Sequence, residues 1–299
     1  MALSLDLNNP KEPIVAQRFV ELDSTNTEAL RQLRSADNRP AQRSFIISGH
    51  QTAGRGQAGN GWHDTPGNNL LSTLVYYPQQ LRAADLFAIT QVSSLAVVET
   101  VKILTGIDAL IKWPNDILAA LPDRPNKVQQ TGNPGGYQSS SVDNESDQIG
   151  FAAKRGSQYA KLCGLLIQNS LFGKNVQWTI IGAGLNVNEN NFPVELEKSA
   201  ISLRKLVGHE LDLSTCEATY AATLLAKIDQ YLTPLNRIGL QRDYLARLHR
   251  LHEKSNYLNV ATDTVFVGTI RDVDSSGQLV VEHRVGRLQR YGLKEIRFL

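Results

Sequence analysis

Residues 45–62, FIISGHQTAGRGQAGNGW, join a short apolar run to a loop in which four glycines surround one arginine. Glycine lets backbone N–H groups approach a ligand that side chains would otherwise block. Arg55 adds a permanent positive charge with a planar donor fork suited to carboxylate or phosphate, and Trp62 adds a flat apolar face. The pattern predicts a loop that closes over a small anion. A flexible surface loop with one solvated arginine is the alternative.

This loop matches neither of the two common nucleotide-binding signatures. A Walker loop needs Gly-Lys followed by Ser or Thr, and the dinucleotide fingerprint needs GxGxxG at the start of a helix. The loop by itself therefore does not identify its ligand.

The composition is that of an ordinary globular chain of 299 residues, with 41 % hydrophobic and 20 % charged residues. Lysine plus arginine number 31 and aspartate plus glutamate 29, which argues against a strongly basic surface for nucleic acid or membranes. Cys163 and Cys216 are too few for a disulfide framework or a four-cysteine zinc site. There is neither a run of 18 apolar residues nor a basic leader before an apolar core, so we expect a cytoplasmic protein.

The hydrophobic pattern predicts alternating strands and helices up to about residue 253. The expected elements are a strand over 14–22, a helix over 27–35 after capping candidates at 23–26, strands over 45–48 and 70–77, a helix over 81–104 closed by Thr105-Gly106, a strand over 109–113 stopped by Pro114, strands over 162–168 and 176–183 joined as a hairpin, and a helical region over 215–251 interrupted near Pro234 and Gly239.

Two segments differ from this alternating pattern. From Tyr257 onward, short strand-like runs flank the turn Asp274–Gly277, which predicts a small all-β barrel after a boundary near 253–256. Residues 131–148 have almost no apolar side chains to bury, so we expect an inserted, mobile loop over about 121–158. A lid or a docking surface is the alternative function for this insertion.

Three further motifs carry polar residues at the ends of strands. In KWPND, Lys112 is suited to a phosphate and Asp116 to a divalent metal or an amine; a solvated surface turn is the alternative. In KLCGLL, Lys161 can reach a carboxylate or phosphate, whereas an ordinary strand-edge lysine discourages aggregation. In GAGLNVN, Asn186 presents a donor and an acceptor that match an adenine edge, or it simply caps a turn.

The order DSTN, GRG, KWPND, KLCG and GAGLNVN resembles that of the biotin–protein ligases, the biotin–[acetyl-CoA-carboxylase] ligases, from about Ile14 to the C-terminus apart from the insertion. The resemblance implies an α/β (α+β) catalytic domain over residues 1–253, with a mixed sheet flanked by helices, and an SH3-like β-barrel domain over 254–299. It also implies a reaction in which biotin and ATP, with Mg²⁺, form biotinyl-5′-adenylate and pyrophosphate. The biotinyl group then passes to a lysine of a biotin carboxyl-carrier domain.

The resemblance also assigns roles to individual positions. The residues it implies as catalytic are Arg55, Lys112 and Lys161. Those implied at biotin are Ser24, Thr25, Asn26, Gln51, Gly54, Arg55, Gly56, Gln57 and Lys161. Those implied at ATP or the adenylate are Trp62, Lys112, Asn115, Asp116 and Asn186, and no metal ligands are assigned. Joining two anions requires positioning and cationic compensation rather than a side-chain nucleophile.

The chain departs from the family pattern at three places. Gln57 follows GRG where some ligases carry arginine, and the insertion separates KWPND from the lysine strand, so Lys161 is preferred to Lys127 because Gly164-Leu165-Leu166 follow it. An N-terminal helix-turn-helix needs roughly sixty residues before the first strand, so DNA binding is not expected. Exposed strand edges in the catalytic domain would support a homodimer.

Two other functions stay open. A lipoate or octanoate ligase or transferase has the same catalytic fold, and a non-catalytic binding module would use the β domain and the insertion to hold a partner. For the leading interpretation, the entropy cost of fixing four glycines predicts that residues 54–61 are mobile without ligand and ordered with biotin or adenylate.

Overall fold

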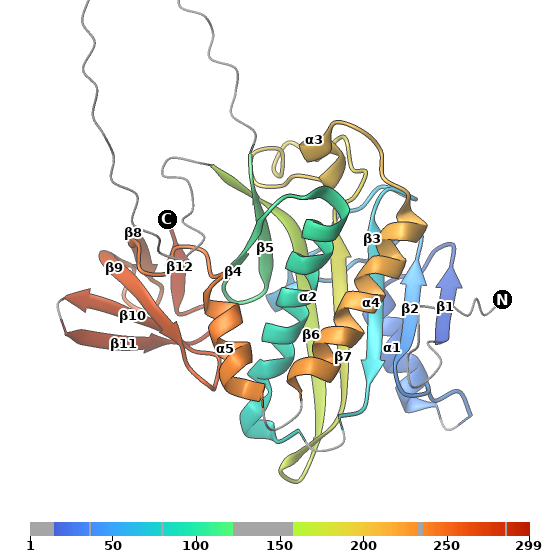
Figure 1. Ribbon diagram of the computed structural model, residues 1–299, viewed down its shortest axis with the longest axis horizontal. Helices are drawn as coiled ribbons and strands as arrows, with labels where there is room; N and C mark the ends of the chain where they lie inside the picture. Colours follow the sequence, from blue (N-terminus) through green and yellow to red (C-terminus); the bar gives the residue numbers. More distant parts are fainter. Residues whose placement is uncertain (1–14, 36, 79–80, 122–157, 233–235, 285) are drawn as a thin grey trace, which may run out of the picture.

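A seven-stranded mixed sheet dominates the computed structural model, which describes residues 15–35, 37–78, 81–121, 158–232, 236–284 and 286–299 (Figure 1). Its strands are β1 Val15–Phe19, β2 Ser44–Ser48, β3 Leu70–Tyr76, β4 Ala109–Lys112, β5 Asp116–Ala120, β6 Tyr159–Phe172 and β7 Asn175–Leu185. Their order in the sheet is β1-β2-β3-β7-β6-β5-β4. Of these described strands, only β1 and β2 pair in parallel, and β6 and β7 form the predicted hairpin. The mixed sheet of the predicted fold class is confirmed.

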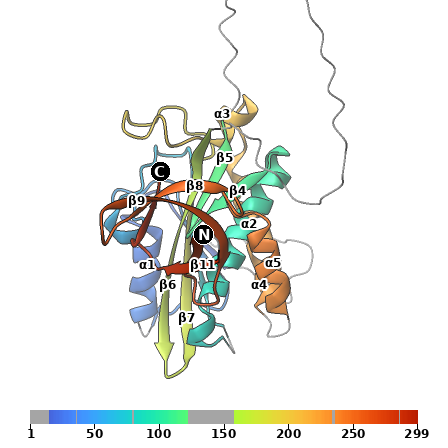
Figure 2. The ribbon, with the colours of Figure 1, turned by 90° about the vertical axis from the view of Figure 1, so that its left-hand side faces the viewer.

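Helices cover both faces of this sheet. Because successive residues of a strand point to opposite faces, Phe45 and Ile46 lie in two different apolar clusters. The smaller cluster packs under α1 (Thr25–Arg34), and the larger packs under α2 (Phe87–Thr105) and α4 (Leu213–Tyr231). Figure 2 shows α1 on one side of the sheet and α2, α4 and α5 (Arg237–Leu245) on the other.

The helix α2 lies at the centre of the larger cluster. It ends where predicted, because Gly106 adopts φ 72° and its N–H donates to the Lys102 carbonyl. With the turn before it, residues 83–105 are long and apolar enough to cross a membrane, the one such helix in the described part of the chain. The most apolar window of this helix is 67 % buried in the fold, as in a core helix.

Several predicted boundaries were wrong, for local reasons. α1 begins at Thr25, so Thr25 and Asn26 lie within its first turn and Ser24 takes the N-cap position. α2 begins at Phe87 because residues 83–85 form a 3₁₀ turn first. Gly239 does not interrupt a helix but lies inside α5, since a helix tolerates one glycine at a cost of about 1 kcal/mol. Pro234 lies outside the described residues, as do residues 122–157 of the predicted insertion.

Two elements were not predicted. β5 follows the KWPND turn directly and pairs with β4 and β6, although its sequence DILAA is too short to show a clear period. α3 (Leu203–Val207) has five residues and is capped by the Ser202 hydroxyl, which accepts from the Lys205 N–H.

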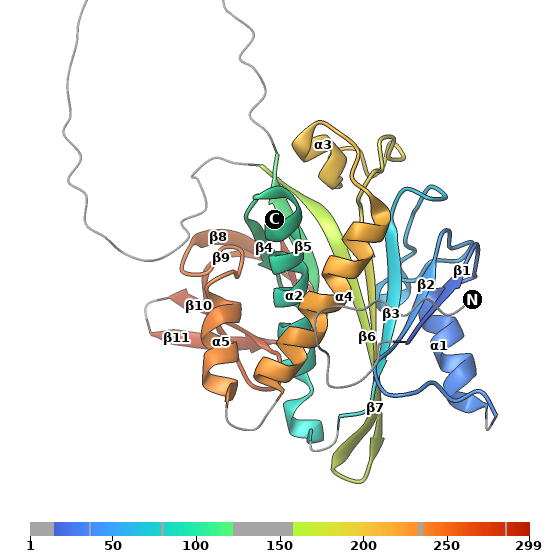
Figure 3. The same ribbon diagram turned by 45° about the vertical axis from the view of Figure 1, so that its right-hand side comes forward.

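The C-terminal strands form an antiparallel sheet of their own (Figure 3). They are β8 Lys254–Asn259, β9 Thr264–Val273, β10 Leu279–Arg284, β11 Arg287–Tyr291 and β12 Ile296–Phe298, in the order β11-β10-β9-β8-β12. In the described strands β11 and β12 do not pair, so the sheet fits an SH3-like domain without closing into the predicted barrel. β8 starts at the predicted boundary, but one apolar cluster continues from the main sheet to Tyr257 and Val281. The division into two domains stays a prediction.

Backbone and side-chain contacts fix the C-terminal sheet beside β4. The Ile111 N–H donates to the Arg247 carbonyl and the His249 N–H to the Ile111 carbonyl, both at 2.8 Å. The Trp113 indole Nε1–H donates to the Gly277 carbonyl at 2.9 Å. A Cβ on Gly277, whose φ is +87°, would lie 2.6 Å from the Phe87 ring. These contacts set the position of the C-terminal residues relative to the KWPND turn.

Trp113→Phe is expected to weaken this contact, because phenylalanine keeps the ring but leaves the Gly277 carbonyl without its donor. The free energy of unfolding should fall by about 1 kcal/mol, measured by urea denaturation. Trp178→Phe is the matched control, since Trp178 packs under α1 and its indole donates to none of the described residues. Equal losses in the two variants would contradict the role of the Trp113 bond.

We expect the contact between β4 and the residues that precede the C-terminal sheet to be sensitive to acid, because it contains the imidazole of His249. Burial, and then the charges of Arg250 and Lys112, lower the pKa of His249 to about 4. The unfolded chain titrates near 6.5, so it binds more protons than the folded chain between pH 6.5 and 4, and stability falls as the pH falls through that window. Between pH 7 and pH 5, the wild type should lose on the order of 1 kcal/mol more unfolding free energy than His249→Phe, after discounting for partial exposure. Identical pH profiles in urea melts would contradict this.

Candidate active site

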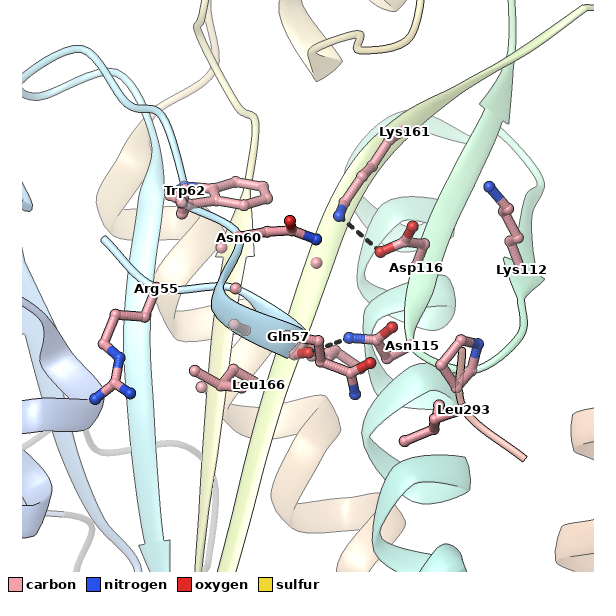
Figure 4. A pocket seen from close by; sticks show the side chains of 18 of the residues that line it. Arg55, Gln57, Asn60, Trp62, Lys112, Asn115, Asp116, Lys161, Leu166 and Leu293 are labelled. Atoms are coloured by element: carbon pink, nitrogen blue, oxygen red, sulfur yellow. Dashed lines mark hydrogen bonds and ion pairs between the residues drawn. The ribbon is translucent and has the colours of Figure 1, made fainter. Parts of the chain in front are cut away.

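A cavity of about 560 Å³ opens between the glycine loop, the ends of β4–β7 and the C-terminal tail (Figure 4). Its lining brings together residues from all five sequence motifs, which lie far apart along the chain. The predicted residues that line it are Ser24, Thr25, Asn26, Gln51, Arg55, Gly56, Gln57, Trp62, Lys112, Asn115, Asp116 and Lys161. Its volume is in the range of small-molecule sites.

One side of the cavity is a network of neutral polar groups at the start of α1. The Thr25 N–H donates to Gln51 Oε1 at 2.8 Å. Asn26 Nδ2 donates to the Leu166 carbonyl at 3.0 Å, and its Oδ1 accepts from the Thr73 hydroxyl at 2.6 Å. Asn26 and Thr25 are buried, so these bonds fix their orientation. This side is suited to an uncharged polar ring.

The floor of the cavity consists of backbone where GAGLNVN crosses it. A Cβ on Gly182 would lie 2.0 Å from Asn26 Oδ1, and a Cβ on Gly184 would lie 2.5 Å from the Trp62 ring. These two glycines therefore leave the space that Asn26 and Trp62 occupy. The indole Nε1–H of Trp62 is buried and has no acceptor among the described residues.

The other side of the cavity is cationic. Lys161 Nζ lies 2.7 Å from Asp116 Oδ1 and 5.7 Å from the centroid of the Trp62 ring. The sheet register places Asp116 opposite Gly164 on β6, and the Lys161 ammonium lies beside Gly164, 3.2 Å from where its Cβ would be. Asp116 also lies opposite Lys112 on β4. Figure 4 shows Lys161, Asp116 and Lys112 together, with Arg55 across the cavity from them.

Asn115 holds the KWPND turn against β6. Its Nδ2 donates to the Leu165 carbonyl, and the Leu165 N–H donates to the Asn115 carbonyl at 3.1 Å. The Trp113–Pro114 peptide in this turn is cis. The side-chain amide of Asn115 is thus used to place its neighbours, Lys112 and Asp116.

The C-terminal tail, residues 293–298, contributes to the cavity, and this contribution was not predicted from the sequence. Lys294 and Arg297 line the cavity, and Phe298 lies under Lys112, with 5.6 Å from Nζ to the ring centroid. Of the described lining residues, five are lysine or arginine, whereas Asp116 is the one carboxylate. Such a surplus of positive charge attracts an anionic ligand. The sequence signal was weak, because KEIR in a β domain reads as ordinary solvated charge.

The glycine loop is a compact hairpin over the cavity. The Trp62 N–H donates to the Gly54 carbonyl at 2.9 Å and the Gly56 N–H to the Asn60 carbonyl at 2.7 Å. Gly54 is not part of the lining but supports Trp62, because a Cβ there would lie 2.7 Å from the Trp62 carbonyl. Gln57 lies in the short 3₁₀ turn Gln57–Gly59 and does line the cavity. Ligand-dependent ordering of this loop stays a prediction.

Two other residues that the sequence motifs contain are buried outside the described cavity lining. Asn186 is buried outside the lining, and its Nδ2 donates to the Ile201 carbonyl at 3.1 Å, which differs from the expected contact with adenine. Cys163 faces the core, and burial raises the pKa of its thiol above the ordinary value, so it is no nucleophile. Lys127, the lysine not preferred, lies outside the described residues.

Among the residues that the structure describes, carboxylates and imidazoles do not gather into a metal site. No group of three or more His, Cys, Asp or Glu side chains is close enough to hold a metal in the parts of the chain that the structure describes. Asp116 alone offers a carboxylate in the cavity lining that is described.

Comparisons with known proteins agree with this geometry. Residues 19–186 match the biotin/lipoate A/B protein ligase family. The biotin–[acetyl-CoA-carboxylase] ligase of Paracoccus denitrificans is 27 % identical over 273 residues, 89 % of this chain and 93 % of that protein. The bifunctional ligase/repressor BirA of Bacillus subtilis is 26 % identical over 204 residues, 68 % of this chain, and the match spans about half of that relative's length. The biotin protein ligase of Aquifex aeolicus, solved with biotin and ATP, shares the fold, with a TM-score of 0.67 at 18 % identity, over 95 % of this chain and 99 % of that one.

Proposed function

Because the chain belongs to the biotin/lipoate A/B protein ligase family, we propose that it is an ATP-dependent biotin–protein ligase. It joins biotin and ATP into biotinyl-5′-adenylate and pyrophosphate, then transfers the biotinyl group to a lysine of a carboxyl-carrier domain. The observation that carries the proposal is that one cavity combines a neutral hydrogen-bonding side with a cationic side.

The neutral side fits the head of biotin. Its ureido ring is uncharged and needs both donors and acceptors, which Thr25, Asn26 and Gln51 present in fixed orientations. The valerate chain then extends toward Lys161, where the carboxylate meets the α-phosphate.

The cationic side supports the first chemical step. A carboxylate oxygen of biotin attacks the α-phosphorus, a C–O–P linkage forms, and the bond to pyrophosphate breaks. Lys161 and Lys112, with Lys294, Arg297 and, from across the cavity, Arg55, offset the charge of the two anions as they approach. In the second step the carrier amine attacks the carbonyl carbon and AMP leaves, so no side-chain nucleophile is needed.

Mg²⁺ belongs to the proposal as the partner of ATP. This ion is commonly held by one or two carboxylates together with phosphate oxygens, and the single cavity carboxylate fits that pattern. Asp116 would hold it, and the bound ion would neutralise charge on the triphosphate. The amide of Asn115 is already used for the Leu165 carbonyl.

The protein partner in this proposal is a biotin carboxyl-carrier domain, and the enzyme acts in the cytoplasm without binding nucleic acid or membranes. A homodimer is included, because β1 is an edge of the main sheet and its outer side pairs with none of the described strands. Sedimentation with and without biotin measures that assembly.

Pyrophosphate release tests the reaction, with MgATP and either biotin or lipoate. Release with biotin, followed by a mass increase of one biotinyl group on a single lysine of a carrier domain, is the expected result. Lipoate ligation is the second candidate, since the matched family includes lipoate ligases. Release with lipoate alone would overturn the assignment, and release with neither would favour a non-catalytic binding module.

A further inference from the structure

The two ends of the glycine loop meet below the cavity at a buried carboxylate. Asp64 lies two residues after Trp62, and its side chain is 0 % exposed. Its Oδ2 accepts from His50 Nδ1 at 2.8 Å and from the Gln51 N–H at 3.3 Å. One oxygen atom of Asp64, which follows the loop, thus accepts hydrogen bonds from His50 and Gln51, which precede it.

This carboxylate is connected to the cavity through Gln51. The main-chain N–H of Gln51 is held by Asp64, and its side-chain Oε1 accepts from the N–H and the hydroxyl of Thr25 at 2.8 and 3.2 Å. Gln51 and Thr25 both line the cavity, whereas Asp64 and His50 do not. A displacement of Asp64 would therefore move Gln51, a lining residue, although Asp64 itself lies outside the lining.

A nearby carboxylate shows what a purely structural site looks like. Glu189 is buried, and it accepts from the Thr65 N–H, the Thr65 hydroxyl and the Asn69 amide at 3.0 to 3.1 Å, through both of its oxygens. Asp64, in contrast, has Oδ1 buried with no donor among the described residues. A buried acceptor without a partner costs free energy, so packing alone does not explain an aspartate at this position.

We propose that Asp64, supported by His50, is a positioning residue that clasps both ends of the glycine loop and holds Gln51 against Thr25 for biotin and the adenylate. The inference rests on the proposed function. Groups behind a binding site commonly fix the orientation of the groups in it, and a loop with four glycines has little conformational preference of its own.

Asp64→Ala tests the clasp. The dissociation constant for biotin and the rate at which biotinyl-adenylate leaves the enzyme should both rise about tenfold, as expected for a lost hydrogen bond to a charged group. Asp64→Asn should recover most of both values, because its Oδ1 can still accept from His50 and Gln51 while its amide nitrogen takes the place of the unpartnered oxygen. If Asp64→Asn raised the dissociation constant and the release rate as much as Asp64→Ala does, Asp64 would not act as a hydrogen-bond acceptor for His50 and Gln51.

A matched control separates positioning from stability. Thr100→Val breaks the buried contact of Thr100 with Thr223 between α2 and α4, away from the loop, so it should lower the melting temperature and leave both biotin values unchanged. An Asp64→Ala variant that behaves in the same way would overturn the proposal. If Asp64→Ala does not fold, the comparison of His50→Ala with His50→Gln tests the same proposal, because glutamine can still donate to Asp64 and alanine cannot. Biotin binding at the wild-type level in His50→Ala would overturn the proposal. Absence of biotin-dependent pyrophosphate release by the wild type would instead reject the proposed function.

Discussion

Lys161→Met is expected to lower the rate of biotinyl-adenylate formation by about a hundredfold or more, with little change in stability. Lys161 is the cation that lies nearest both to Asp116 and to the Trp62 ring, where the two anionic reactants would meet. The ion pair itself is exposed to solvent, with 38 % of the lysine side chain accessible, so its loss should cost at most about 1 kcal/mol of folding free energy. Pyrophosphate release under single-turnover conditions measures the rate.

Two further variants show what Lys161 does. Lys205→Met removes a lysine outside the cavity, over Phe192, and should leave the rate unchanged. Lys161→Met alone leaves the Asp116 carboxylate without its ion-pair partner. The double variant Lys161→Met with Asp116→Asn removes that carboxylate as well. If the double variant regained wild-type rates, Lys161 would only be neutralising Asp116, which would contradict its proposed contact with the reactants.

The sequence predicts the polar lining of the cavity well, because each motif places its residues at a strand end or a tight turn. Lys112, Asp116 and Lys161 come from adjacent strands, so pairing of β4, β5 and β6 is enough to bring them together. Thr25 and Gln51 meet because α1 and the glycine loop both follow neighbouring parallel strands. Local patterns thus specified most of the site.

The sequence does not predict contacts that depend on how the two sheets pack. Lys294 and Arg297 reach the cavity because Trp113 and Phe87 receive the Gly277 turn, a contact with no local signature. Asn186 is buried outside the described lining, and its contact with adenine stays a prediction. Its motif does contribute to the site, but through the absence of side chains at Gly182 and Gly184.

Gly182→Ala is expected to have the largest effect on biotin binding. The new Cβ would lie 2.0 Å from Asn26 Oδ1, so the amide must leave its bonds to Thr73 and to the Leu166 carbonyl. Two hydrogen bonds at about 1 kcal/mol each, together with overpacking, correspond to a dissociation constant for biotin that rises roughly a hundredfold. Titration calorimetry measures it.

Gly268→Ala is the matched control for this change, because its added Cβ would lie 2.6 Å from the Val281 side chain in the C-terminal sheet, outside the described cavity lining. It should lower stability and leave the dissociation constant for biotin unchanged. Combining Gly182→Ala with Asn26→Ala tests the mechanism. Truncating Asn26 removes the atom that clashes, so the double variant should be more stable than Gly182→Ala alone, while biotin binding stays weak because the amide is gone. If the double variant were the less stable of the two, the clash would lie elsewhere, and the role of Gly182 in leaving space for Asn26 would be wrong.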